Sequence, residues 1–185
     1  MSLTEPPPLW PDALRYSQRK FPSYRFVPGL NPHPTGNPAG HSYKQHLEIK
    51  THLSPDQWKS NDIYLFGIDL YHQGYLWESH EAWEALWHLT QKNDAEGQFL
   101  QGLIQNAAAQ LKIHLQQWSA AKHLSHEAWE RLCFVLGSGV CDEKNYFMGI
   151  DVSKLAMTLQ NYYGSLWTES HSPSEQAPKL LIHEC

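Results

Sequence analysis

Apolar residues recur at intervals of three and four over most of the chain after residue 50, which places them on one face of an α-helix. Five segments show this pattern: about 55–74, 76–90, 94–118, 120–136 and 151–167. No segment combines alternating apolar and polar residues with the turn signals of a hairpin. The pattern predicts an all-α fold, a helical bundle of about five helices joined by short loops.

Helix start and stop signals support these bounds. In Ser54-Pro55-Asp56-Gln57, the serine is an N-cap, the proline suits the first helical position, and Gln57 completes a capping box. Gly74 is expected to end that helix. Asn93 or Asp94 is expected to cap the third helix and Asp151 the fifth, while Gly137-Ser138-Gly139 stops the fourth.

The first 46 residues are dense in proline and glycine and show no sustained period. They also contain six aromatic residues, whereas disordered segments are usually poor in aromatics: Trp10, Tyr16, Phe21, Tyr24, Phe26 and Tyr43. We therefore expect an irregular N-terminal arm (1–46) packed on a helical body (47–170), followed by a flexible tail (171–185). Residues 1–50 carry six basic against three acidic residues, so the arm either folds back on the acidic body or binds an acidic partner.

Composition excludes several classes of protein. The net charge is −5, so no general attraction to nucleic acid is expected. No apolar run reaches the length of a membrane span, and the N-terminus lacks the apolar stretch of a signal peptide. The three cysteines have no CxxC spacing, which argues against a disulfide framework or a cysteine-rich zinc site. We expect a soluble cytoplasmic protein with neither a nucleic-acid nor a membrane partner.

His80 and Glu84 are the strongest candidates for chemistry. They lie four residues apart on an expected helix and so share one face, with tryptophans close by in the sequence. Burial raises the pKa of a carboxyl and lowers that of an imidazole, while their mutual attraction does the reverse. Either outcome suits proton transfer or metal ligation, with Glu81 as a further catalytic candidate. The alternative is a structural pair that satisfies itself at a helix–helix contact.

His80-Glu81-Ala82-Trp83-Glu84 differs from the His-Glu-x-x-His motif of zinc peptidases at its last position. A metal held by His80 and Glu84 would need a third protein ligand, for which His33 and His41 in the arm are the candidates. Gln101 and Gln105 form a second polar pair one turn apart, which faces either the His80 stripe or solvent. No serine or cysteine occupies a nucleophile elbow.

The hexapeptide Ser79–Glu84 recurs as Ser125–Glu130. The flanking residues diverge, since the first copy continues Ala-Leu-Trp and the second Arg-Leu-Cys. We interpret the repeat as coincidence or local similarity rather than as two equivalent sites.

The motif His80-x-x-x-Glu84-x-x-Trp87, followed by Gln101-Gly-Leu-Ile-Gln105, resembles the DUF309 family of uncharacterised helical proteins. The arm segment from Tyr24 to His41 is similar to an N-terminal extension of some members, so the resemblance covers residues 24–136. It implies an all-helical bundle but no activity. The positions to which it points are Glu78, His80, Glu81, Glu84, Trp87, Gln101 and Gln105.

Two hypotheses follow. The protein is a metal-assisted or acid–base enzyme, or a metal-binding protein, with a divalent metal at His80 and Glu84 and a small molecule in a groove lined by His, Glu and Trp. Alternatively, it is a non-catalytic peptide-binding or scaffolding bundle. In both cases we expect His80 and Glu84 within direct or one-water reach, on a largely buried face near Gln101 or Gln105.

Overall fold

The computed structural model describes residues 3–45, 49, 51–168, 173 and 176–183. They form a 3₁₀ helix, η1 (Pro55–Ser60), and five α-helices: α1 (Asp62–His72), α2 (Leu76–Trp87), α3 (Ala95–His114), α4 (Trp118–Gly137) and α5 (Val152–Trp167). A two-stranded sheet, β1 (Tyr146–Phe147) and β2 (Ile150–Asp151), precedes α5. The predicted all-α bundle is confirmed.

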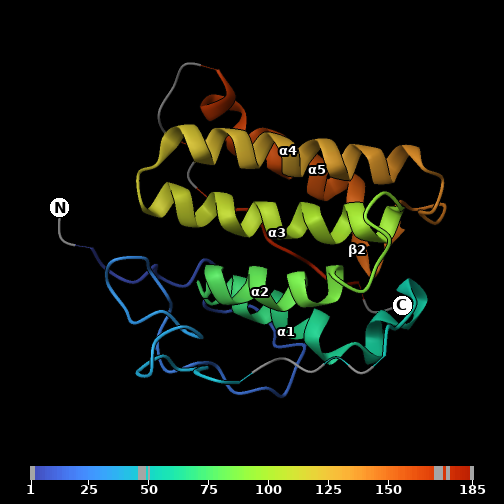
Figure 1. Cartoon of the computed structure of the whole chain (residues 1–185). Coiled ribbons are helices and arrows are strands. Elements are labelled where there is room, and N and C mark those ends of the chain that lie inside the picture. The colour runs from blue at the N-terminus through green and yellow to red at the C-terminus, as the bar shows by residue number, and fades with distance from the viewer. Residues whose placement is uncertain (1–2, 46–48, 50, 169–172, 174–175, 184–185) are drawn as a thin grey trace.

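The helices pack in chain order. α3 lies between α2 and α4, while α1 packs on α2 and α5 packs on α4 (Figure 1). The core between α1 and α2 is formed by the fully buried Trp83, whose Nε1 donates to the Tyr64 carbonyl at 3.2 Å. A Cβ on Gly67 would lie 2.3 Å from Trp83 Nε1, so this position has no room for a side chain.

Local signals were decisive at most helix starts. The Asp94 and Asp151 side chains accept hydrogen bonds from Gly97 N and Lys154 N, as predicted for N-caps. The capping box at Ser54 is also present, but the helix that it starts is interrupted. Asn61 caps a new helix by accepting from Tyr64 N at 3.1 Å, so the expected single helix over 55–74 is η1 followed by α1.

The small hairpin was not predicted. Its turn places Met148 and Gly149 in the left-handed region, with φ of 47° and 78°. Methionine is unusual there, so the turn residues carried no hairpin signal. Tertiary contacts hold the turn: the Tyr64 hydroxyl donates to the Met148 carbonyl at 2.9 Å, and the Trp58 ring covers Gly149.

The two hexapeptide copies have equivalent positions on α2 and α4, the helices on either side of α3. In each copy the serine and alanine are buried, and the serine hydroxyl donates to a carbonyl three residues earlier. The shared part of the pattern is therefore a helix-packing face: Ser79 and Ala82 on α2, Ser125 and Ala128 on α4.

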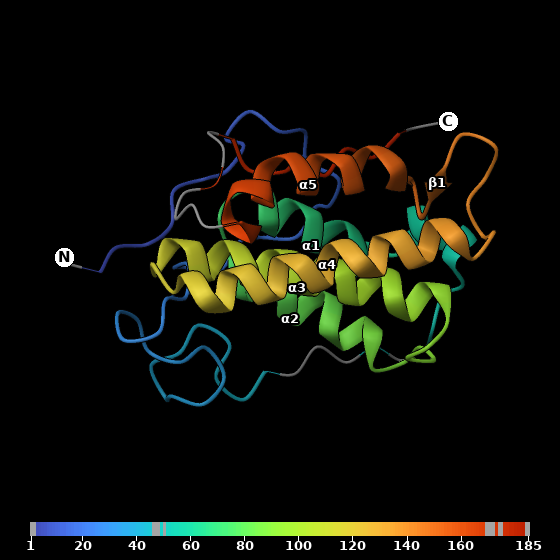
Figure 2. The same ribbon diagram turned by 90° about the horizontal axis from the view of Figure 1, so that it is seen from above.

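The arm runs along α1 and then folds into a loop, residues 24–43, beside α2 (Figure 2). Part of the segment 171–185, expected as a flexible tail, lies outside the described residues. Its described residues 176–183 pack on the body: Leu180 is fully buried, and Ile182 bridges to Ile150. Within the described chain, no helix combines the length and apolarity needed to cross a membrane.

Candidate functional site

A histidine and two glutamates meet on the outer side of α2. The potential ligand atoms of His80, Glu81 and Glu84 all lie within 4.8 Å of one another, and each residue is half-buried. His80 Nε2 is 3.3 Å from Glu81 Oε1. The structure thus brings the two expected metal ligands together and adds Glu81.

The hydrogen bonding of His80 defines its tautomer. Its Nδ1 bonds to the carbonyl oxygen of Trp77, and a carbonyl can only accept. The neutral ring therefore carries its proton on Nδ1 and turns the lone pair of Nε2 toward Glu81. Two acceptors at this distance need a proton or a cation between them. A backbone carbonyl that orients the imidazole in this way is typical of histidine metal ligands.

Burial and mutual repulsion perturb the charges of the cluster. Burial raises the pKa of Glu81 to about 7, and the neighbouring charges of Glu84 and Glu78 act in the same direction. Burial lowers the pKa of His80, while its bond to the Trp77 carbonyl and the two glutamates oppose this shift. The carboxylates of the cluster therefore repel one another, and a bound cation would offset that repulsion.

Glu78 lies on the same helix but performs a different task. It is buried, and its Oε1 accepts from Phe26 N at 2.9 Å and from His41 Nε2 at 3.0 Å. The other ring nitrogen of His41 bonds to Ser42 Oγ at 2.8 Å. Glu78 and His41 thus join the arm to α2, and His41 has no ring nitrogen left for a metal.

His33, the other arm histidine expected as a third metal ligand, also has a different role. Its ring packs edge-on against Trp77, with centroids 5.3 Å apart, and its Nδ1 accepts from Gly36 N at 3.2 Å. The neutral ring must then carry its proton on Nε2, which makes that nitrogen a donor. The third residue that approaches His80 and Glu84 is therefore Glu81 and not an arm histidine.

The expected glutamines are divided between two environments. Gln105 is buried and uses both ends of its amide toward α4, donating to Glu127 and accepting from Arg131 at 2.7 Å. Its amide is therefore not available to Glu84. Gln101 is half-buried on α3.

Trp87 ends the helix that carries the cluster, and a residue that was not predicted covers it. The Lys92 ammonium lies 3.3 Å from the Trp87 ring centroid and donates to the Trp87 carbonyl at 2.5 Å. Because Lys92 follows the end of α2, no helical spacing pointed to it.

The fold and this cluster define a small all-α protein that displays a half-buried His/Glu/Glu group on one helix. Residues 64–124 match the model of the domain of unknown function DUF309. The predicted resemblance is confirmed over this stretch, which contains the whole cluster. No curated protein matches the chain.

Proposed function

We propose that this protein binds a divalent transition-metal ion through His80 Nε2 and the carboxylates of Glu81 and Glu84. The observation that carries the proposal is the convergence of three ligand atoms within 4.8 Å, with the imidazole already turned toward them. One imidazole and two carboxylates suit Zn²⁺, Mn²⁺ or Fe²⁺ better than the softer metals that prefer thiolates.

Such a centre supports metal-assisted acid–base chemistry. Three protein ligands leave a coordination position for water or a small ligand, and a bound metal lowers the pKa of that water toward neutrality. The side chains of His80 and Glu81 are 21% and 36% exposed, so a ligand can reach them from solvent. Trp77, one turn before the cluster, provides an aromatic border.

A cytoplasmic location is part of the same proposal. Cys133 and Cys141 are free thiols, and both are half-buried. Unpaired cysteines fit a reducing compartment.

Metal titration of the untagged, chelator-stripped chain tests the centre, with Zn²⁺ followed by calorimetry and Co²⁺ by visible absorption. We expect one equivalent to bind. Glu84→Gln keeps the side-chain volume but removes the anionic ligand. Because loss of a residue that merely orients a ligand costs 10–100-fold in affinity, this variant should lose on the order of 100-fold or more.

The second hexapeptide supplies a matched control. His126 and Glu130 occupy the same helical positions on α4, 3.5 Å apart, but are 48% and 59% exposed. Glu130→Gln should leave metal affinity unchanged. A chain that binds no metal, or equal affinities of Glu84→Gln and Glu130→Gln, would refute the centre. A Glu84→Ala variant that lost only stability would then favour the structural pair.

A further inference from the structure

Three side chains outside the His80 cluster form a hydrogen-bonded chain from the arm to α2. Ser42 Oγ is 2.8 Å from His41 Nδ1, and His41 Nε2 is 3.0 Å from Glu78 Oε1. The side chains of His41 and Glu78 are each only 5% exposed, whereas Ser42 is half-buried. The chain therefore runs from a buried carboxylate to a hydroxyl near the surface.

The proton positions follow from the partners. A carboxylate only accepts, so His41 Nε2 carries a proton and donates it to Glu78. In the neutral ring Nδ1 must then accept, and the only proton between it and Ser42 is that of the hydroxyl. Hydroxyl, imidazole and carboxylate thus stand in the order in which a serine nucleophile is activated. Compared with the usual triad, the two ring nitrogens exchange partners, with Nδ1 facing the hydroxyl and Nε2 the carboxylate.

The arm loop holds this arrangement from several sides. The Tyr24 hydroxyl donates to the Pro32 carbonyl at 2.7 Å and accepts from His41 N at 3.2 Å, and its ring packs on the imidazole with centroids 4.6 Å apart. Ser42 N donates to the Pro34 carbonyl at 3.1 Å. The loop is anchored to α2 by the bonds of Phe26 N and His41 Nε2 to Glu78, neither of which involves the Ser42 hydroxyl.

We propose that Ser42 is a nucleophile for acyl transfer from an ester. Ser42 Oγ bonds to the acyl carbonyl carbon while its proton moves to His41 Nδ1, and Glu78 stabilises the resulting imidazolium through Nε2–H. When the carbonyl re-forms, the bond to the alcohol oxygen breaks and that oxygen takes the proton from Nδ1. Water then attacks the acyl carbon, passes a proton to His41, and releases the carboxylic acid as Ser42 regains its proton.

Covalent labelling with an alkyl fluorophosphonate tests the nucleophile in the full chain. We expect one adduct, located at Ser42 by peptide mapping, that forms at the same rate in the presence of a metal chelator. Ser42→Ala should abolish it while retaining metal binding. His41→Gln removes the general base and should slow labelling on the order of 100-fold or more. Glu78→Gln, which alters the positioning residue, should slow it as well.

Ser138→Ala is the matched control. It removes an exposed serine hydroxyl that donates to the Val135 carbonyl at 2.7 Å and leaves Ser42, His41 and Glu78 unchanged. Labelling of Ser42 should stay close to the wild-type rate. The proposal is overturned if Ser42 acquires no adduct, if the exposed Ser138 reacts equally fast, or if His41→Gln reacts like the wild type. The location of the wild-type adduct decides even if His41→Gln fails to fold.

Discussion

Two buried ionisable residues of α1 hold segments that are far apart in the sequence. The Asp69 carboxylate accepts from Tyr16 N at 2.8 Å and from Ser17 N at 2.9 Å. His72 Nε2 accepts from Leu180 N at 3.3 Å. Each residue thus ties a segment that is distant in the sequence to α1.

His72 should make stability depend on pH. Burial lowers its pKa from 6.5 to about 4, because the charged ring would lose its hydration. Below pH 6.5 His72 becomes protonated in the unfolded chain, whereas in the folded chain it stays neutral until the pH reaches about 4. The stabilisation is therefore complete above pH 6.5 and is lost between 6.5 and 4, with a total of about 3 kcal/mol.

Urea denaturation at pH 7.5 and pH 5 measures this contribution. His72→Phe should show a smaller loss of stability between the two values than the wild type, by about 2 kcal/mol. His123, whose side chain is 72% exposed, provides the control. The His123→Gln variant should lose as much stability between pH 7.5 and pH 5 as the wild type. If His72→Phe and the wild type lost the same free energy of unfolding between the two pH values, His72 would not be the source of the pH dependence.

At the scale of the helix, glycine has opposite effects on stability at two positions. Gly67 on α1 lies against the Trp83 indole, with no space for a Cβ. Gly164 on α5 has no atom within 4 Å of a Cβ built there, among the residues described. Intrinsic helix propensity favours alanine over glycine by about 1 kcal/mol at both sites, so packing alone distinguishes them.

The paired substitutions test this difference. Gly164→Ala should raise the free energy of unfolding by roughly 0.5–1 kcal/mol. Gly67→Ala should lower it by about 1–3 kcal/mol, because Trp83 is fully buried and its ring must shift. Thermal or urea unfolding measures both, and a stabilising Gly67→Ala would show that α1 and α2 are less closely packed than described.

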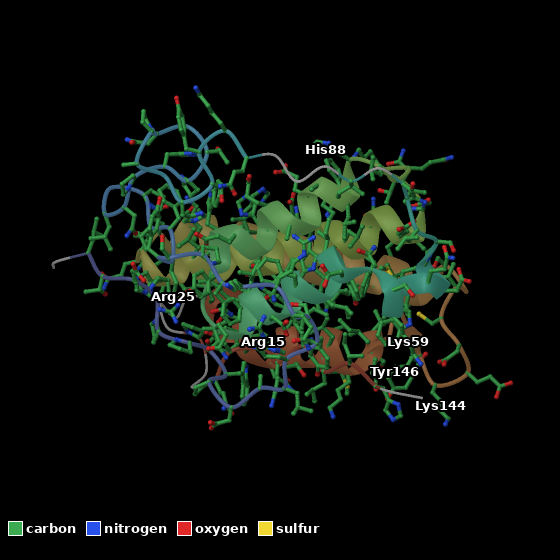
Figure 3. All side chains as sticks on the ribbon, turned by 90° about the horizontal axis from the view of Figure 1, so that it is seen from below. Arg15, Arg25, Lys59, His88, Lys144 and Tyr146 are labelled. Atoms are coloured by element: carbon green, nitrogen blue, oxygen red, sulfur yellow. The ribbon has the colours of Figure 1, made fainter. Side chains whose placement is uncertain are left out.

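At the scale of the whole molecule, the arm is a layer that covers α1 through aromatic and ionic contacts. Arg15 and Arg25 lie along it in the view from below (Figure 3), with their guanidinium groups 4.2 Å from the Phe21 centroid and 4.8 Å from the Tyr75 centroid. Phe21 stacks on Tyr75 at 5.2 Å. The basic arm is thus engaged with the helical body.

Removal of the buried Asp69 carboxylate should release the arm from α1 while the bundle stays folded. Asp69→Ala leaves the backbone donors of Tyr16 and Ser17 unpaired, at a cost of about 2–5 kcal/mol. Trypsin should then cut at Arg15, Arg19 and Lys20 more than about tenfold faster, as expected when opening costs at least 1.4 kcal/mol less.

Asp62→Ala controls for the loss of a charge on the same helix. Asp62 pairs with Arg19 at 2.5 Å, but both side chains are exposed, at 53% and 38%. Exposed pairs contribute little, so tryptic cleavage should stay near the wild-type rate. Equal protection in Asp69→Ala would mean that the aromatic contacts hold the arm without this carboxylate.

The sequence by itself determined the helices and one pair of the candidate site, because both depend on neighbours within one turn. N-caps such as Asp94 act on donors three residues away, and the spacing of His80 and Glu84 is a property of any α-helix. The resemblance to DUF309 had the same local origin, since both of its motifs lie within the matched residues.

Only the tertiary structure decided which groups meet across the chain. It joined His41 to Glu78 over 37 residues, turned Gln105 toward α4, and made Gly67 a contact surface for Trp83. These outcomes depend on how the elements are placed relative to one another. A periodic sequence pattern contains no information on the distances between elements. For that reason the sequence named the candidate residues, and packing decided which of them became partners.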